Sequence, residues 1–318
     1  MASGISVCGV KLGLFENPHY RRPAPESPSM EIGTLPRQRV SLECGEVTYL
    51  RHGSGPPLLL VHGIPTSSRL WEPLLGDLGE RFDCIVPDLL GMGMSRPRAG
   101  ADLGSPGQAD MLAQLLDALQ VDRVLAAFHD QGGAHGLQFL RGYGERVDAV
   151  ALCDIVCYDN WVVPAITAVE AMCRFPGPLH MATRLGLVEP VMVRTWPFPQ
   201  TTVRAPLPPA LIDDWMGAMR EGGERLQSFC AYVRGQSPRY TADTASVLGG
   251  WEKPALVVWA ANDRFLSPSW ASRLCEDTPG APDQPVMLPF AGHFFHAEVP
   301  RTAAAVLGDF FSGVTRPG

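Results

Sequence analysis

One short segment places an acidic side chain where it could act as a nucleophile. Residues 128–133, FHDQGG, follow the apolar run 124–127 and precede a helix-like segment, 134–143. A strand, a sharp turn with one reactive side chain at its tip, and a helix make up a nucleophile elbow. The tip residue here is Asp130, and two glycines follow it closely, as a tight turn requires. As a nucleophile, Asp130 would attack a carbon atom and form an ester. The alternative interpretation is that Asp130 is an ordinary turn residue.

Three further polar residues follow apolar, strand-like runs. They are His293, Asp263 and Asp154. An imidazole can take a proton from water, and a carboxylate beside it holds the ring in the useful tautomer. Either Asp could supply that carboxylate, and we favour Asp263, which lies 30 residues before His293.

The elements that must position these residues alternate between two patterns. Short continuous apolar runs, such as 58–61, are typical of strands buried on both faces, and helical stripes such as 70–78 lie between them. This alternation predicts an α/β fold with a mostly parallel sheet and helices on both faces. Functional groups in such sheets collect at the carboxyl ends of the strands. The residues expected to converge there are Ile64, Asp130, Asp154, Asp263 and His293.

The pattern changes along the chain and suggests three parts. Residues 1–37 are rich in proline and read as an irregular N-terminal arm. Residues 38–154 and 246–318 carry the alternating α/β pattern of a core. Residues 155–245 lack strand-like runs and carry helical stripes with many prolines and aromatic residues, which predicts an inserted helical lid.

Composition narrows the classes of function. A net charge of −7 without a basic face argues against nucleic acid as a partner. Eight cysteines without a CxxC pair predict reduced thiols in a cytoplasmic protein, and no apolar run is long enough to span a membrane. No residue pattern demands a metal or another cofactor, and a homodimer is left open.

In order and spacing, the motifs resemble the α/β-hydrolase superfamily. The similar branch uses Asp as nucleophile and contains epoxide hydrolases, haloalkane dehalogenases and haloacetate dehalogenases. The resemblance covers about residues 40–315. Its motifs are HGIP at 62–65, DLLGMGMS at 88–95, HDQGG at 129–133, DRF at 263–265 and GHF at 292–294.

The resemblance implies a role for each site residue. Asp130 would be the nucleophile, and His293 would activate water to hydrolyse the ester. The acid would be Asp263 or Asp154, since members of this branch use one site or the other. The main-chain N–H groups of Ile64 and Gln131 would form the oxyanion hole.

The leaving group requires its own donors, and the resemblance implies that the lid supplies them. Epoxide hydrolases use lid phenols, and Tyr232 occupies the expected place of one, with Tyr240 as a nearby alternative. His180 stands roughly where the other phenol is expected, and Trp161 and Tyr158 are further candidates to line the pocket. Haloalkane dehalogenases usually carry Trp directly after the nucleophile, where this chain has Gln131.

These features predict a hydrolase that opens an apolar, cyclic or aromatic epoxide to a vicinal diol. The reaction would pass through an alkyl ester on Asp130 that His293 then helps to hydrolyse. The alternative is a haloalkane or haloacetate dehalogenase with the same nucleophile. A third hypothesis is a non-hydrolytic binding protein, or a cyclase or lyase, that kept the fold.

Overall fold

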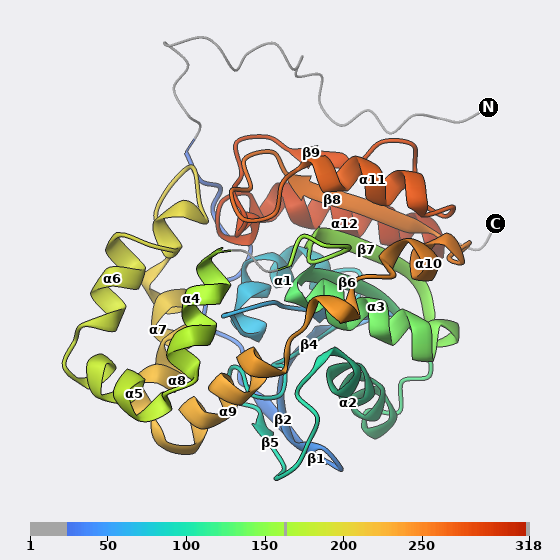
Figure 1. Cartoon of the computed structure of the whole chain (residues 1–318). Coiled ribbons are helices and arrows are strands. Elements are labelled where there is room, and N and C mark those ends of the chain that lie inside the picture. The colour runs from blue at the N-terminus through green and yellow to red at the C-terminus, as the bar shows by residue number, and fades with distance from the viewer. Residues whose placement is uncertain (1–23, 162–163, 316–318) are drawn as a thin grey trace.

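A twisted sheet forms the centre of the protein. The computed structural model describes residues 24–161 and 164–315, and these residues form one nine-stranded sheet with helices on both faces (Figure 1). Along the sheet the strands are β1 (Gln38–Leu42), β2 (Gly45–Gly53), β4 (Asp83–Pro87), β3 (Pro57–Val61), β6 (Val124–Asp130), β7 (Val147–Ile155), β8 (Ala255–Ala260) and β9 (Val286–Leu288). The short strand β5 (Arg96–Pro97), which the sequence did not reveal, pairs with β2.

The predicted α/β fold class is confirmed. Strands β3, β4 and β6 to β9 run parallel, whereas β2 is antiparallel to both β1 and β4. The side chains of β3 alternate between the two faces of the sheet. Leu58 and Leu60 pack into one apolar cluster, and Leu59 and Val61 pack into the other. A strand buried on both faces must therefore be apolar at every position, which explains the continuous run.

Helices cover each face of the sheet. On one face α1 (Glu72–Gly79) packs against α12 (Pro300–Thr315). On the other face α2 (Ser105–Ala118) packs against α3 (Gln131–Tyr143), and α10 (Thr244–Gly249) packs against α11 (Ser269–Asp277). The seven cysteines in the described part of the chain are free, as the sequence predicted.

The segment predicted to be a lid lies between β7 and β8; we keep the name lid for it, and Figure 1 shows its helices gathered beside the core. They are α4 (Pro164–Cys173), α5 (Pro176–Arg184), α6 (Val188–Arg194), α7 (Pro209–Trp215), α8 (Gly217–Glu221) and α9 (Gly223–Gly235). Single-turn 3₁₀ helices occur at η2 (Ser68–Leu70), η3 (Gly144–Arg146), η4 (Phe198–Gln200), η5 (Pro238–Tyr240) and η6 (Phe295–Ala297).

The predicted N-terminal arm is described only in part. Residues 24–37 contain no helix or strand, and the main chain at Glu26 donates a hydrogen bond to the Glu298 carbonyl. Residues 1–23 lie outside the described residues. Within the described ranges, no helix is both long and apolar enough to cross a membrane.

The glycines after Asp130 let α3 approach the sheet, and this can be tested by stability. A Cβ on Gly133 would lie 2.3 Å from the Ile155 Cβ, whereas one on Gly142 in the same helix would meet nothing within 4 Å. Gly133→Ala should therefore lower the free energy of unfolding by about 1–3 kcal/mol. Gly142→Ala should raise it by up to about 1 kcal/mol.

Denaturant titration of the two variants measures both effects. Equal stability of Gly133→Ala and the unchanged protein would contradict the close approach of α3 to β7.

Candidate active site

The turn at Asp130 presents a carboxylate at the edge of the sheet. Strand β6 ends at Asp130 and α3 begins at the next residue, and Asp130 has φ 53° and ψ −126°. A non-glycine residue in this conformation costs about 1–3 kcal/mol, so the surrounding packing must hold it there. A Cβ on Gly132 would lie 2.5 Å from the His62 carbonyl oxygen, so this position needs glycine. The turn therefore has the geometry that the sequence predicted.

The two oxygens of Asp130 have different surroundings. Oδ1 accepts a hydrogen bond of 2.7 Å from the Ile64 main-chain N–H, and the main chain of Gln131 also bonds to the carboxylate. Oδ2 lies 3.3 Å from Nε2 of His293. One oxygen is thus held by main-chain donors, while the other is left facing the imidazole.

The structure pairs the imidazole with Asp263. Nδ1 of His293 lies 2.7 Å from Oδ2 of Asp263. Oδ1 of Asp263 accepts hydrogen bonds from the main-chain N–H groups of Phe265 at 2.7 Å and Leu266 at 3.0 Å. Because one oxygen is fixed by the loop, the other points at the ring and sets its orientation.

Asp154, the alternative acid, makes no such contact. Its Oδ1 accepts a hydrogen bond of 2.8 Å from the Ala260 N–H, and its Oδ2 has no hydrogen-bond partner among the described residues. Burial, together with the nearby negative charge of Asp263, raises the pKa of Asp154 well above its usual range. Its surroundings therefore favour the protonated form of Asp154, and it makes no hydrogen bond to the imidazole.

The charges of the site hold a proton on His293. Burial alone would lower the pKa of His293, but the negative charges of Asp263 and Asp130 outweigh it and raise that pKa well above its usual value. Burial would raise the pKa of Asp130, but its contacts with His293 lower it overall. The two carboxylates beside His293 thus favour the protonated form of its imidazole.

A narrow apolar cavity opens onto this triad. The cavity volume is about 40 Å³, which is room for a few water molecules. Its lining comes from the core and from the lid, and consists of Ile64, Pro65, Asp130, Val156, Trp161, Ile166, Pro197, Phe198, Thr201, Phe265, Leu266, His293 and Phe294. A neutral apolar molecule is the ligand that fits such walls.

Trp161 is the one predicted lid residue in this lining, and the others lie elsewhere. Tyr232 is fully buried, and its hydroxyl is 2.8 Å from Nε2 of His135. The Tyr158 hydroxyl donates to Asp277, the Tyr240 hydroxyl accepts from Arg239, and the His180 ring lies against Gly222. The prediction that Tyr232 faces the substrate is thus corrected, because α9 directs this side chain onto α3 in the core.

Sequence reasoning missed several cavity residues. Phe265 and Leu266 lie two and three residues after Asp263, and Phe294 directly follows His293, so their place beside the two motifs was an available signal. Ile166 and Phe198 come from the lid, where no motif marked them. Their side chains are apolar like most of the lid, so the sequence does not separate lining from packing.

One cluster has the residue types of a metal site. Ligand atoms of His129, Asp154 and His293 lie within 4.8 Å of one another. However, both nitrogens of His293 already face carboxylates, and Nε2 of His129 contacts the His293 carbonyl oxygen. His293 therefore has no lone pair free for a metal, and the two atoms that remain, Nδ1 of His129 and Oδ2 of Asp154, are too few donors for a metal site.

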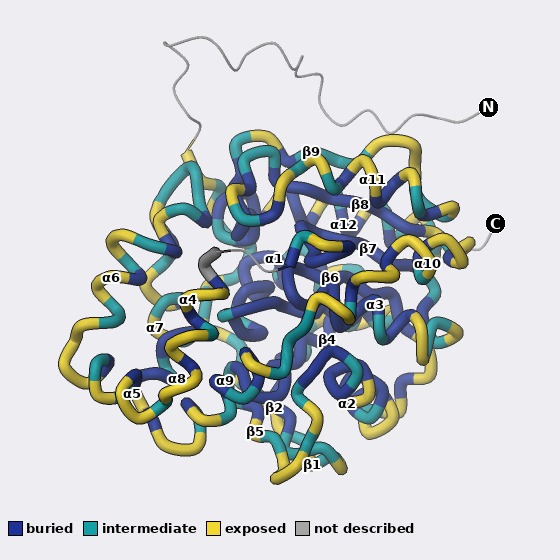
Figure 2. Tube along the Cα trace, viewed as in Figure 1, coloured by how far each residue is buried: buried dark blue, intermediate teal, exposed yellow. Residues whose placement is uncertain are grey.

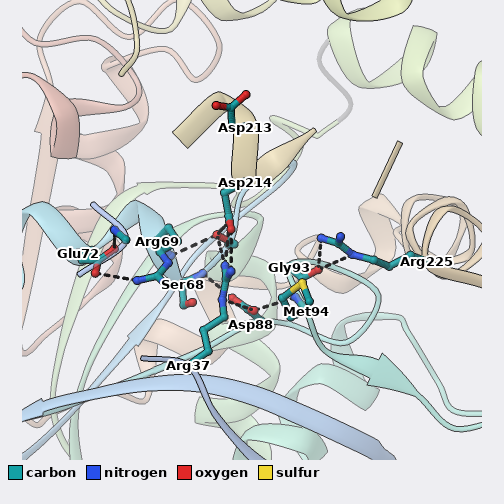
Figure 3. Close-up of polar contacts among 12 residues, drawn as sticks. Arg37, Ser68, Arg69, Glu72, Asp88, Gly93, Met94, Asp213, Asp214 and Arg225 are labelled. Atoms are coloured by element: carbon teal, nitrogen blue, oxygen red, sulfur yellow. Dashed lines mark hydrogen bonds and ion pairs between the residues drawn. The ribbon is translucent and has the colours of Figure 1, made fainter. Parts of the chain in front are cut away.

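The loop that carries Ile64 is fixed at several points (Figure 3). Nε2 of His62 accepts from the Leu89 N–H at 3.1 Å, and the Ser68 N–H donates to Oδ1 of Asp88 at 2.7 Å. These bonds tie the loop after β3 to the loop after β4. They keep the Ile64 N–H aimed at Asp130.

The lid also holds this loop, through Asp214 in α7. The Ser67 hydroxyl donates to Oδ2 of Asp214, and the Arg37 guanidinium bonds both Asp214 oxygens at 2.7 and 2.9 Å. Figure 3 shows Arg37 between Asp214 of the lid and Asp88 of the core. A second bond between lid and core, from Arg225 to the Gly93 carbonyl, does not touch the loop. Asp214 is therefore placed to position the oxyanion donor.

Comparisons with known proteins agree with this geometry. The family model described as alpha/beta hydrolase fold matches residues 56–300. The chain is 30% identical over 278 residues to haloalkane dehalogenase 2 of Mycobacterium tuberculosis, covering 84% of this chain and 92% of that protein.

Solved structures share the fold at lower identity. An alpha/beta hydrolase fold protein from Burkholderia ambifaria has a TM-score of 0.74 at 23% identity, covering 90% of this chain and 99% of that one. The haloalkane dehalogenase DbeA from Bradyrhizobium elkani has a TM-score of 0.69 at 19% identity, covering 88% and 98%. These likenesses bear on the fold alone.

Replacing each acid should reveal which one sets the charge of His293. Asp263→Asn should lower the pKa of His293, because it removes the strongest interaction that opposes the effect of burial. Asp154→Asn should leave that pKa almost unchanged, because the protonated form of Asp154 is favoured and Asp154 makes no hydrogen bond to the ring. Histidine resonances followed by NMR against pH measure both, and equal shifts would contradict the assignment of Asp263.

Removing the lid contact should loosen the loop that carries Ile64. Asp214→Ala should speed amide hydrogen exchange in peptides covering residues 62–70, and Asp214→Asn, which keeps an acceptor for Ser67, should do so less. Asp213→Ala is the matched control, because Asp213 bonds Arg220 on the lid surface.

Arg225→Met is a second control, since it breaks a lid contact that does not involve Ser67. If all four variants exchange alike, or none differs from the unchanged protein, Asp214 does not position the loop.

Proposed function

The chain belongs to the alpha/beta hydrolase fold family, and we propose that this hydrolase displaces halide from small apolar haloalkanes through an ester on Asp130. Membership in the family is as the sequence predicted. The observation that carries the proposal is that the two carboxylate oxygens of Asp130 have different contacts. Oδ1 accepts from the Ile64 main-chain N–H, while Oδ2 is directed toward His293 and the Asp130 side chain lines an apolar cavity.

The first step needs only the carboxylate. Oδ2 of Asp130 attacks the carbon that bears the halogen, a C–O bond forms, and the C–X bond breaks with release of halide. The low pKa of Asp130 supports this role, because the group is ionised and surrounded by apolar walls that exclude water.

Forming the ester changes the state of His293. The negative charge of Asp130 is one of the interactions that keep the pKa of His293 high. An ester carries no charge, so this contribution disappears and the imidazolium can release its proton to solvent. His293 then becomes a neutral base at the moment when a base is required.

The second step is hydrolysis of the ester. Water attacks Cγ of Asp130 while Nε2 of His293 takes its proton, and Asp263 supports the ring. The negative charge that develops on Oδ1 would meet the N–H group of Ile64, and the Gln131 N–H, which also bonds to the carboxylate, would add to this stabilisation. Collapse breaks the bond from Cγ to Oδ2, and the leaving alkoxide takes the proton from His293. The sum is haloalkane plus water giving alcohol, halide and a proton.

The side chains that line the cavity favour displacement of a halide over opening of an epoxide. A departing halide needs no proton, whereas an opening epoxide leaves a strongly basic alkoxide. Apart from the catalytic pair, the described lining side chains with an N–H or O–H are Trp161 and Thr201, and the Thr201 hydroxyl donates to the Phe198 carbonyl at 2.7 Å. No phenol lines the cavity in the described part of the chain, so the epoxide hypothesis loses its expected acid.

The experiment traps the ester. With His293→Gln the first step should proceed and the second should stall, so mass spectrometry of the peptide with Asp130 should show an added alkyl group after incubation with short bromoalkanes. The double variant Asp130→Asn, His293→Gln is the control and should remain unmodified.

A parallel incubation with short alkyl epoxides distinguishes the alternative. An adduct with the mass of the whole epoxide, and none from bromoalkanes, would replace the proposal with epoxide opening. Absence of any adduct across both panels would contradict Asp130 as nucleophile.

A further inference from the structure

The outer side of the lid carries an unusual apolar surface. The large hydrophobic side chains that are more than a third exposed all fall between residues 172 and 191 in the described chain. This lid patch consists of Met172 (36% exposed), Phe175 (66%), Met181 (58%), Leu185 (66%), Leu187 (61%) and Val191 (54%). Single exposed apolar residues are ordinary, but a cluster on neighbouring helices marks a contact surface.

The residues of the lid patch lie on or beside helices that pack against one another. Helix α5 contacts both α4 and α6, so the residues of these three helices lie side by side. In α5 the side chains of Met181 and Leu185 are four residues apart and share one face, while Leu179 and Thr183 face inward. Figure 2 shows α5 and α6 as a mixture of exposed, intermediate and buried residues, in contrast to the buried core strands.

The exposed charges within this surface are arginines, although one of them, Arg174, is paired with Glu170 at 3.4 Å. Between residues 166 and 195 every exposed charged residue is an arginine, namely Arg174, Arg184 and Arg194. The two acids of the stretch, Glu170 and Glu189, are half-buried, and each is paired with an arginine. The whole chain carries a net charge of −7, so this face differs in sign from the rest of the molecule.

We propose that the lid patch docks onto an anionic lipid surface. Phe175, Leu185 and Leu187 would enter the boundary between headgroups and acyl chains, while the arginines contact lipid phosphates. The negative charge elsewhere on the chain would be repelled by the same surface, so the protein would bind with the lid toward the lipid.

A second copy of the chain fits this surface less well. In a two-fold symmetric dimer the same patch faces itself, so arginines would meet arginines without an exposed acid on the patch to pair with them. Anionic phosphates supply the missing opposite charge. This comparison selects the lipid over self-association.

The position of the patch suggests what docking achieves. Helix α4 carries Met172 in the patch and Ile166 in the cavity lining, so one helix connects the two surfaces. Apolar molecules concentrate in lipid, and a lid seated on lipid would lie between that reservoir and the cavity. This last link rests on the proposed function, whereas docking itself does not.

Vesicle binding of the full chain tests the docking without any substrate. The unchanged protein should float with vesicles of phosphatidylcholine that contain ~30% phosphatidylglycerol. It should not float with vesicles of phosphatidylcholine alone. The double variant Phe175→Ser, Leu185→Ser should weaken the binding at least about tenfold, because two large apolar contacts are lost.

The arginines are tested with matched charge. Changing Arg174, Arg184 and Arg194 to Gln should also weaken binding strongly, whereas changing the exposed Arg39, Arg98 and Arg301 to Gln removes equal charge elsewhere and should not. Unaltered melting temperatures would show that the variants are folded.

Three results would overturn the proposal. The first is that the unchanged protein does not bind anionic vesicles. The second is that both sets of arginine changes weaken vesicle binding equally. The third is that the unchanged protein forms a dimer, which Phe175→Ser, Leu185→Ser abolishes, and binds no vesicles. The last result would identify the patch as an interface between copies of the chain.

Discussion

A carboxylate held in a strained turn is the constraint on which this structure depends. Asp130 can keep its unfavourable main-chain conformation only because the residues around it leave no other arrangement. A Cβ on Gly63 would lie 2.1 Å from Oδ1 of Asp130, and Gly132 faces the main chain after β3 at similarly short range. The strands, the glycines and the loop with Ile64 therefore form one unit, in which the main chain binds one carboxylate oxygen and presents the other.

The charges around that carboxylate explain the choice between the acids. Two ionised carboxylates share one imidazolium, and a third buried negative charge would be unfavourable beside them. The raised pKa of Asp154 reduces this conflict, while Asp263 accepts two main-chain hydrogen bonds and contacts the ring directly. The same balance makes the basicity of His293 depend on whether Asp130 is free or esterified. A single site can therefore support a nucleophilic step and a base-catalysed step in sequence.

The sequence predicted the strands of the core and the helical insertion, but it did not predict which side chains of the insertion reach the cavity. Buried parallel strands need continuous apolar runs, so the residues at their ends, including Asp130 and His293, could be assigned to one edge. The choice of Asp263 over Asp154 could only be favoured, because it depends on loop hydrogen bonds that leave no sequence pattern. Tyr232 was placed wrongly because a lid helix packs against the core as well as the cavity. Its spacing to Asp263 says nothing about which of these its side chain meets.

The central claim is that Asp130 forms a covalent ester, and oxygen tracing in one turnover tests it most directly. With protein in excess over a bromoalkane in ¹⁸O-labelled water, the first alcohol formed should contain unlabelled oxygen from Oδ2, and the label should appear in the carboxylate of Asp130. Alcohol that carries ¹⁸O from the first turnover, with an unlabelled Asp130, would mean that water attacks the substrate directly. That result would contradict the ester mechanism.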